Sequence, residues 1–185
     1  MMTGHPDVLD TLEALMARKG GDLYGGECVT QLQHALQAAN LAEQDGKTSS
    51  IVVAALLHDI GHLFEPEFER ALMTNEDHRH EKLGDAFLKR FFGAEVTEPV
   101  RLHVAAKRYL CATRPDYFGS LSPASVHSLK LQGGPMSDEE VAQFEAEPHF
   151  AAAVDVRLYD DLAKDPDART PDLAHFFLHV RKVAQ

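Results

Sequence analysis

The sequence has few cysteines and no long apolar run. Its two cysteines, Cys28 and Cys111, are too few for a disulfide framework, and we expect both to be thiols in a reducing cytosol. No stretch approaches the roughly 20 apolar residues of a membrane span, and the N-terminal residues lack the basic and apolar segments of a signal peptide. We therefore expect a cytoplasmic protein with no membrane partner.

Positive charge is also scarce. The chain has 29 acidic residues against 18 Lys and Arg, which gives a formal net charge of −11. Such a balance argues against nucleic acid or an anionic membrane surface as a partner. An anionic ligand would need cations that the fold places locally.

A sustained alternation of β-branched and polar residues is missing, which argues against a β-sheet. Apolar residues recur instead at helical spacing, as at Leu9, Leu12 and Leu15. A chain of 185 residues fits one domain that can bury a sizeable core. We therefore predict a single all-α helical bundle over residues 1–185.

Several short patterns mark where the helices begin and where loops lie. Residues 122–123 and 170–171 each place a hydroxyl side chain before proline, the pattern of an N-cap followed by proline in the first turn. Residues 137–140 fit a capping box. The proline and polar content of residues 63–77 and 113–123 predicts loops.

The segment VVAALLHDIGH at residues 52–62 interrupts an apolar run with His58 and Asp59, and His62 follows one turn later. We expect a buried helix over residues 49–62, in which a buried His and Asp are costly unless each has a partner. The two side chains project about 100° apart on a helix, so they can approach one point from different directions. Because a carboxylate can bridge two ions while an imidazole binds one, the segment predicts a site for two metal ions.

Further ligands would come from other helices, as is usual for metal sites in helical bundles. The candidates are His34 in residues 27–44, His80 in residues 80–92, His103 in residues 100–110 and Asp160 in residues 154–164. With His58 and Asp59 they make a set of four imidazoles and two carboxylates.

A histidine, an adjacent His-Asp pair and a distant aspartate resemble the signature of the HD-domain superfamily, whose fold is an all-α bundle. The two further histidines look like the dinuclear version of that family. The match of HEKLGDAFL to a family helix favours His80 over His78. Asp160 is preferred to Asp155 and Asp161 because an arginine precedes it by about one turn.

The ligand set leaves the chemistry open. Most HD proteins are phosphohydrolases, in which metal-bound water attacks a phosphate ester, and a smaller branch uses two irons with O₂. Four imidazoles and two carboxylates suit iron, but they also hold other divalent metals.

Three tracts outside the ligands resemble the organophosphonate oxygenases of the PhnZ and TmpB type, over about residues 22–160. They are LYGGECVTQLQHALQ at 23–37, HVAAKRYL at 103–110 and LQGGPMSDEE at 131–140. The resemblance implies a mixed-valent Fe(II)/Fe(III) pair and O₂ as co-substrate. It also implies cleavage of the C–P bond of a 1-hydroxy-2-aminoethylphosphonate or its trimethylammonio counterpart, which releases phosphate with glycine or glycine betaine. An upstream hydroxylase would supply this small-molecule substrate.

The same resemblance implies roles for Tyr24 and Glu27 as catalytic residues that also bind the substrate. The tyrosine takes an iron position before the substrate arrives, and the glutamate lies beside the substrate's amine. An acidic and aromatic pair also suits a quaternary ammonium. Gly25 and Gly26 leave room for it, which favours the trimethylammonio substrate.

The remaining substrate-binding predictions concern the phosphonate group. Lys107 follows His103 by four residues, so on a helix it points to the same side and can present its ammonium to the anion; we also expect it to be catalytic. His62 and Arg157 stand at similar spacing from a predicted ligand, and both are expected to be cations. The full set predicted to bind substrate is Tyr24, Glu27, His62, Lys107, Ser125, Ser128 and Arg157, in which the serines match family contacts to phosphonate oxygens.

Two alternatives remain open at this point. A metal-dependent phosphohydrolase of nucleotides or other phosphate esters would share the ligands, but it has no need of the tract with Tyr24 and Glu27. A degenerate HD module that only binds a metal or an anion would have no need of an intact set of six ligands.

Overall fold

The computed structural model describes residues 7–64 and 80–185. Within these ranges the chain forms helices and no strands, which confirms the all-α prediction. The helices are α1 (Val8–Lys19), α2 (Gln31–Gln44), α3 (Ser49–Leu57), the 3₁₀ helix η1 (Ile60–Leu63), α5 (His80–Leu88), α6 (Ala94–Thr113), α7 (Tyr117–Ser120), α8 (Pro123–Leu131), α9 (Asp138–Glu145), α10 (Phe150–Leu162) and α11 (Leu173–Val183).

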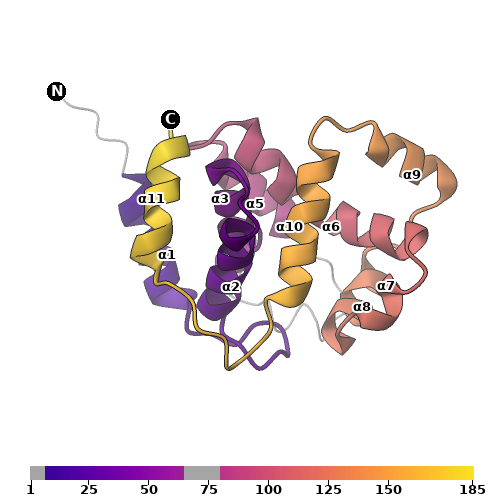
Figure 1. Ribbon diagram of the computed structural model, residues 1–185, viewed down its shortest axis with the longest axis horizontal. Coiled ribbons are helices and arrows are strands. Elements are labelled where there is room, and N and C mark those ends of the chain that lie inside the picture. The colour runs from indigo at the N-terminus through magenta and orange to yellow at the C-terminus, as the bar shows by residue number, and fades with distance from the viewer. Residues whose placement is uncertain (1–6, 65–79) are drawn as a thin grey trace.

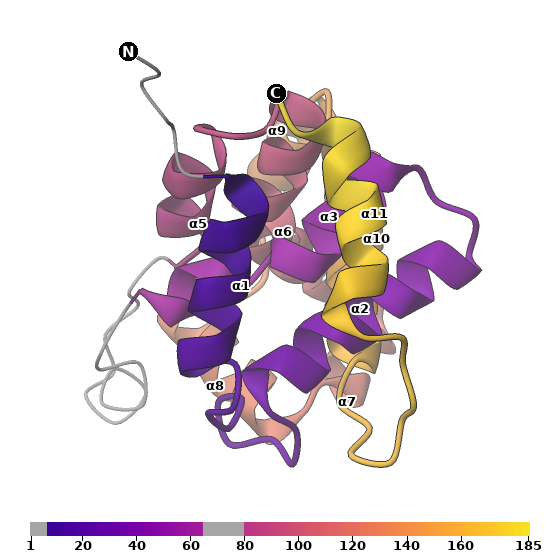
Figure 2. The same cartoon turned by 90° about the vertical axis from the view of Figure 1, so that its left-hand side faces the viewer.

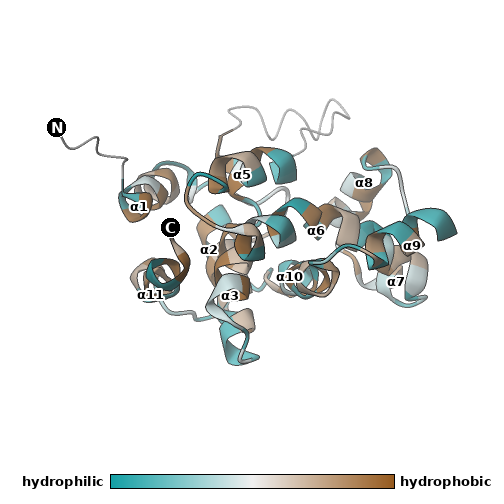
Figure 3. Ribbon diagram, turned by 90° about the horizontal axis from the view of Figure 1, so that it is seen from above, coloured by the Kyte–Doolittle hydropathy of each residue, from teal (hydrophilic) through white to brown (hydrophobic). Residues whose placement is uncertain are grey.

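Helix α3 lies at the centre of the larger part of the bundle. Seen from above, α1 and α11 lie on one side of α2 and α3, and α6 and α10 lie on the other (Figure 3). The short helices α7, α8 and α9 gather beyond α6 and α10 (Figure 1). In this arrangement α3 touches α2, α6, α10 and α11.

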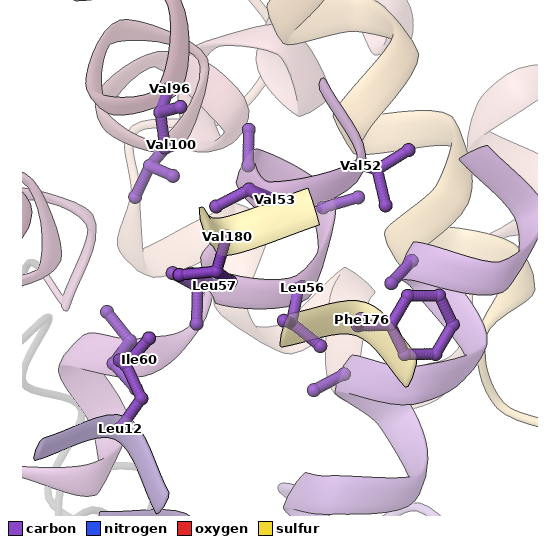
Figure 4. Packing of buried hydrophobic residues seen from close by; sticks show 14 of the residues in the cluster. Leu12, Val52, Val53, Leu56, Leu57, Ile60, Val96, Val100, Phe176 and Val180 are labelled. Carbon is purple, nitrogen blue, oxygen red and sulfur yellow. The ribbon is translucent and has the colours of Figure 1, made fainter. Parts of the chain in front are cut away.

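The central position of α3 explains why its sequence is apolar on every side. All residues from Val52 to Leu57 are buried, because neighbouring helices cover each face. Figure 4 shows the packing around them, with side chains from α1, η1, α6 and α11. The labelled residues of this core are Leu12, Val52, Val53, Leu56, Leu57, Ile60, Val96, Val100, Phe176 and Val180.

A second, smaller apolar cluster lies between α6, α7, α9 and α10. It includes Leu102 and Leu110 of α6, Phe144 of α9 and Ala153 of α10. Because α6 and α10 also contribute to the larger core, both clusters share the same two helices.

Two of the three predicted helix starts are confirmed. Ser122 caps α8 and Ser137 caps α9, in each case by accepting a backbone N–H with the side-chain oxygen. The start predicted at residues 170–171 is wrong. The Asp172 carboxylate accepts the N–H of His175 at 3.0 Å, so α11 begins directly after Asp172.

The two predicted loops have different outcomes. The loop predicted at residues 113–123 contains the short helix α7. Most of the loop predicted at residues 63–77, and the alternative ligand His78, lie outside the described residues. No helix in residues 7–64 or 80–185 is long and apolar enough to cross a membrane.

Candidate metal centre

The helix predicted over residues 49–62 is interrupted at the motif itself. Helix α3 ends at Leu57, and the 3₁₀ helix η1 starts after His58 and Asp59. Gly61 permits this turn, because a Cβ atom there would lie 2.0 Å from the backbone oxygen of His80. Only glycine allows η1 to approach α5 so closely, and this approach brings His80 to Asp59.

One half of the centre is formed by His34, His58, Asp59 and Asp160, all buried. The Nε2 atoms of the two histidines lie 3.1 Å apart. Asp59 Oδ2 lies 3.6 Å from His34 Nε2 and 3.4 Å from His58 Nε2. Asp160 Oδ1 lies 3.5 Å from His34 Nε2, so α2, α3 and α10 converge on this point.

The other half is formed by His80 of α5 and His103 of α6. Their Nε2 atoms also lie 3.1 Å apart. Asp59 Oδ1 lies 3.1 Å from His80 Nε2 and 3.4 Å from His103 Nε2. The two oxygens of Asp59 therefore face two different pairs of imidazoles, and the structure brings together all six residues predicted as ligands.

The tautomers of His34, His58 and His103 follow from their second ring nitrogen. In each ring Nδ1 lies within hydrogen-bond distance of a backbone carbonyl and donates its proton to it. The acceptors are Ala163, Ala55 and Val100, at 2.8, 2.8 and 2.7 Å. The lone pairs of the Nε2 atoms therefore point into the centre, as in metal-binding histidines.

The charges show that a cation fits between these atoms. Two Nε2 lone pairs at 3.1 Å repel each other unless positive charge lies between them. Burial, followed by His58, lowers the pKa of His34 to about 4. For His58, Asp59 and Asp160 together outweigh burial and raise the pKa to about 9, so the pair holds one proton. Asp59 Oδ2 is buried without a hydrogen bond. The donor set fits a metal ion in place of that proton.

Asp160 is held in place by Arg157, which lies one turn earlier on α10. Arg157 Nη1 lies 2.7 Å from Asp160 Oδ2, and the guanidinium also pairs with Asp161 and contacts the hydroxyl of Tyr117. Burial opposes ionisation of Asp160, but Arg157, His58 and Lys164 together outweigh it and keep the pKa of this carboxyl well below its usual range. Asp161 is thus a partner of Arg157, and Asp155 pairs with Lys47 instead of joining the centre.

Tyr24 covers the His34 side of the centre. Its ring stacks on the His34 imidazole with centroids 3.8 Å apart, and its hydroxyl lies 3.4 Å from Asp160 Oδ1. Burial, followed by Asp160, raises the pKa of Tyr24, so the phenol stays protonated. Gly25 and Gly26 have φ angles of 45° and 88°, which only glycine adopts readily, and they form the turn after Tyr24.

Two buried cations lie beside the centre. Lys107 is 2% exposed and donates to Ser128 Oγ at 2.7 Å. Burial, followed by the charge of Arg157, lowers the pKa of Lys107 to about 7. Arg157 is already paired with Asp160 and Asp161, so Lys107 is the buried cation whose charged form a further anion would stabilise.

Lys164 is a site residue that the sequence analysis missed. Its Nζ atom donates to Ser125 Oγ at 3.2 Å and lies 3.9 Å from both Glu27 Oε1 and Asp160 Oδ1. Lys164 follows Asp160 by four residues, the same spacing by which Lys107 follows His103. The four-residue spacing from a predicted ligand could therefore have identified Lys164 in the sequence.

His62 lies beside the centre, where it was predicted. Its ring stacks on His80 with centroids 3.8 Å apart, and its Nε2 lies 3.8 Å from Asp59 Oδ1. Burial, followed by His80, lowers its pKa well below the usual value. This favours a neutral imidazole over the predicted cation.

The fold and site define an all-α protein with a buried histidine and aspartate centre that could hold metal ions. Residues 32–148 match the family model of the HD domain. The chain belongs to the HD-domain family, as its motif predicted.

Two relatives are named as phosphonate dioxygenases. The chain is 48% identical over 178 residues to the [1-hydroxy-2-(trimethylamino)ethyl]phosphonate dioxygenase (glycine-betaine-forming) of Leisingera caerulea, covering 96% of this chain and 90% of the relative. It is also 48% identical over 171 residues to the hydroxymethylphosphonate dioxygenase of Gimesia maris, covering 92% and 85%. An uncharacterised protein of Acanthamoeba polyphaga mimivirus is 39% identical over 158 residues, 84% of this chain and 72% of the relative. The predicted resemblance to organophosphonate oxygenases is confirmed.

Proposed function

We propose that this protein is an iron-dependent dioxygenase that cleaves the C–P bond of a 1-hydroxyphosphonate with O₂ and releases inorganic phosphate. The observation that carries the proposal is a buried centre with one aspartate between two imidazole pairs, next to buried cations. The overall identity of 48% to each of two phosphonate dioxygenases supports the same proposal.

The six candidate ligands divide into two sets that share Asp59. His34, His58 and Asp160 would hold one metal ion, and His80 with His103 would hold the other. We propose a mixed-valent Fe(II)/Fe(III) pair, which when bound supplies the redox chemistry with O₂. The carbonyl partners of the Nδ1 atoms fix the orientation of the rings.

The phosphonate would bind where Lys107 and Arg157 lie close together. Lys107 presents an ammonium, Ser128 accepts from Lys107 and can rotate its hydroxyl toward the anion, and Ser125 lies next to Lys164. The cations supply the local positive charge that the acidic chain otherwise lacks. A bound anion would balance the charge of Lys107. His62, as a neutral imidazole, would donate a hydrogen bond to the substrate.

The substrate's other end would lie beside Tyr24 and Glu27. Glu27 Oε1 is buried without a hydrogen bond and lies 3.9 Å from the Lys164 ammonium, and its negative charge could also face the ammonium group of a substrate. We propose 1-hydroxy-2-(trimethylammonio)ethylphosphonate as the substrate and glycine betaine as the product. The alternative substrate is 1-hydroxy-2-aminoethylphosphonate, which would give glycine. The two named relatives are equally similar to this chain, so identity alone does not choose the substrate.

We also propose an enzyme that acts before this one and a cellular location for the protein. A hydroxylase acting earlier would install the 1-hydroxyl group of the substrate. Cys28 and Cys111 are both free thiols, which supports a cytoplasmic, reducing location.

A comparison of substrates with and without O₂ tests the proposal. Iron-loaded protein is given the trimethylammonio, amino and unsubstituted hydroxymethyl phosphonates, and phosphate release is measured in air and under strict anaerobiosis. We expect release in air only, with the trimethylammonio compound turned over fastest. A phosphohydrolase would instead release phosphate without O₂ from a phosphate ester such as p-nitrophenyl phosphate, and inertness toward all of these compounds would favour a binding module.

A further inference from the structure

A second group of metal-ligating side chains lies between α2 and α11, outside the buried centre. Glu43 is near the end of α2, and His175 and His179 are one turn apart on α11. Glu43 Oε1 lies 2.9 Å from His175 Nε2 and 2.8 Å from His179 Nε2. The three side chains are 31, 38 and 15% exposed, so an ion from solution can reach them.

The arrangement has the features of a ligand set. Histidines four residues apart on one helix present their imidazoles on the same face, and here both Nε2 atoms point at one carboxylate oxygen. His179 Nδ1 lies 3.0 Å from Ser49 Oγ at the start of α3, and this contact fixes the orientation of the ring as outer partners do in metal sites. Glu43, His175 and His179 each offer one ligand atom within 4.8 Å of the others.

We propose that Glu43, His175 and His179 form a second metal site, which takes Zn²⁺ or a similar divalent transition metal ion. Two imidazoles and one carboxylate suit such ions better than Mg²⁺ or Ca²⁺, which prefer oxygen ligands alone. Water completes the coordination, as the exposure of the group allows.

This site is separate from the buried centre. Glu43 follows His34 by nine residues on α2, which corresponds to about 13 Å along the helix axis. An ion at one site therefore cannot contact the ligands of the other, and the inference does not depend on the proposed function.

The expected consequence is structural. Helix α11 packs against α3 and runs close to α2 (Figure 2), and an ion at this site joins it to the helix that carries His34. Because the ligands come from two helices, the folded chain binds the ion and the unfolded chain does not, so the ion stabilises the fold by mass action.

Zn²⁺ alone is the probe for this site. Iron-loaded protein, so that the buried centre is filled, is titrated with Zn²⁺ by calorimetry, and the iron and zinc contents are measured after dialysis. The same titration is done with His175→Ala, His179→Ala and Glu43→Gln. His149→Ala is the matched control, because it removes a partly exposed histidine whose side chain makes no cap hydrogen bond at the start of α10.

We expect one additional equivalent of zinc in the unmodified protein and in His149→Ala, with the iron content unchanged, and none in the three ligand variants. At a hundredfold excess over Kd, zinc should raise Tm by about 5 to 10 °C. Ser49→Ala should bind zinc about tenfold more weakly. Far-UV circular dichroism shows that each variant is folded. The absence of an additional equivalent, or an equivalent that survives the ligand substitutions, would overturn the site.

Discussion

At the scale of single residues, Asp59 determines how the centre is organised. Its two oxygens face separate imidazole pairs, at 3.1 to 3.6 Å from the four nitrogens. Removing one imidazole should therefore affect one half of the centre, whereas removing the carboxylate should affect both.

This difference between the imidazoles and Asp59 gives a prediction for the ligand variants. His80→Ala or His103→Ala should lower the iron content from two per chain to one and abolish phosphate release, while the circular dichroism of the helices is unchanged. Asp59→Asn should lower the binding of both irons. Elemental analysis of iron with parallel activity assays measures this, and a His103→Ala protein that keeps two irons would contradict the assignment.

The pKa of Lys107 leads to a prediction on substrate affinity. Burial and Arg157 lower this pKa to about 7 in the absence of an anion. A bound phosphonate favours the charged ammonium, so the contribution of Lys107 to binding is complete below pH 7 and falls by up to about tenfold per pH unit above it. Anaerobic Kd measurements between pH 6 and 9 test this.

Lys107→Arg is the control for this titration, because a guanidinium stays charged over the whole range. Its Kd should follow only the ionisation of the phosphonate itself, which strengthens binding as pH rises. A Kd for the unmodified protein that rises no more than that of Lys107→Arg would show that Lys107 does not bind the anion as a titrating group.

Lys164 gives a further test at this scale. It lies between Ser125, Glu27 and Asp160, and Lys164→Met should raise KM for the phosphonate by about ten- to a hundredfold, since a hydrogen bond to a charged group is lost. The exposed Lys130, on the neighbouring helix α8, serves as control, and Lys130→Met should leave KM unchanged. A KM for Lys164→Met within twofold of the unmodified protein would remove this residue from the site.

At the scale of elements, the approach of η1 to α5 places the second half of the centre. A Cβ at Gly61 would lie 2.0 Å from the backbone oxygen of His80, whereas a Cβ at Gly21 would meet nothing within 4 Å. Gly61→Ala should therefore push α5 away and displace His80.

We expect Gly61→Ala to lower the free energy of unfolding by about 1 to 3 kcal/mol and to lower iron content and activity. Gly21→Ala should change none of these three properties. Thermal unfolding and iron analysis measure both effects. Full iron content in a stable Gly61→Ala protein would show that this contact does not position His80.

The sequence predicted the helices better than the breaks between them. Apolar spacing and the caps Ser122 and Ser137 indicated where helices lie, because these signals are local. The end of α3 at Leu57 was not predicted, because it depends on a contact between Gly61 and a residue 19 positions later. The start of α11 was misplaced because two capping patterns overlap, and the carboxylate of Asp172 provides the cap.

The candidate site was predictable where one helix carries both a ligand and its neighbour. Lys107 was found from its spacing to His103, and Lys164 has the same relation to Asp160 but lies just beyond the end of α10. The neutral state of His62 could not be predicted, because it depends on burial and on a ring stacked across from another helix. The pairing of Arg157 with Asp161, four residues later on α10, could have been predicted from its spacing.

At the scale of the whole molecule, two apolar clusters share α6 and α10. We propose on this ground that residues 1–185 unfold as one domain. The tyrosine fluorescence, to which Tyr109 and Tyr117 of the smaller cluster contribute, should change at the same urea concentration at which the circular dichroism of the helices is lost. Two separated transitions in the metal-free protein would contradict a single domain.

The fold also explains how an acidic molecule accepts an anion. The chain has a formal net charge of −11, yet Lys107, Arg157 and Lys164 come together beside the metal centre because α6 and α10 lie side by side. The charge of the whole chain argues against large polyanions as partners, whereas the local placement of three cations would suit a small anion.

The stoichiometry of O₂ consumption is the most direct test of whether this chain is a phosphonate dioxygenase. Iron-loaded protein is given 1-hydroxy-2-(trimethylammonio)ethylphosphonate, and O₂ uptake is followed with an electrode while phosphate and glycine betaine are measured in the same sample. We expect one O₂ to be consumed for each phosphate and each glycine betaine formed, and no phosphate to be released without O₂. Phosphate released without matching O₂ uptake would contradict the assignment of this chain as a phosphonate dioxygenase.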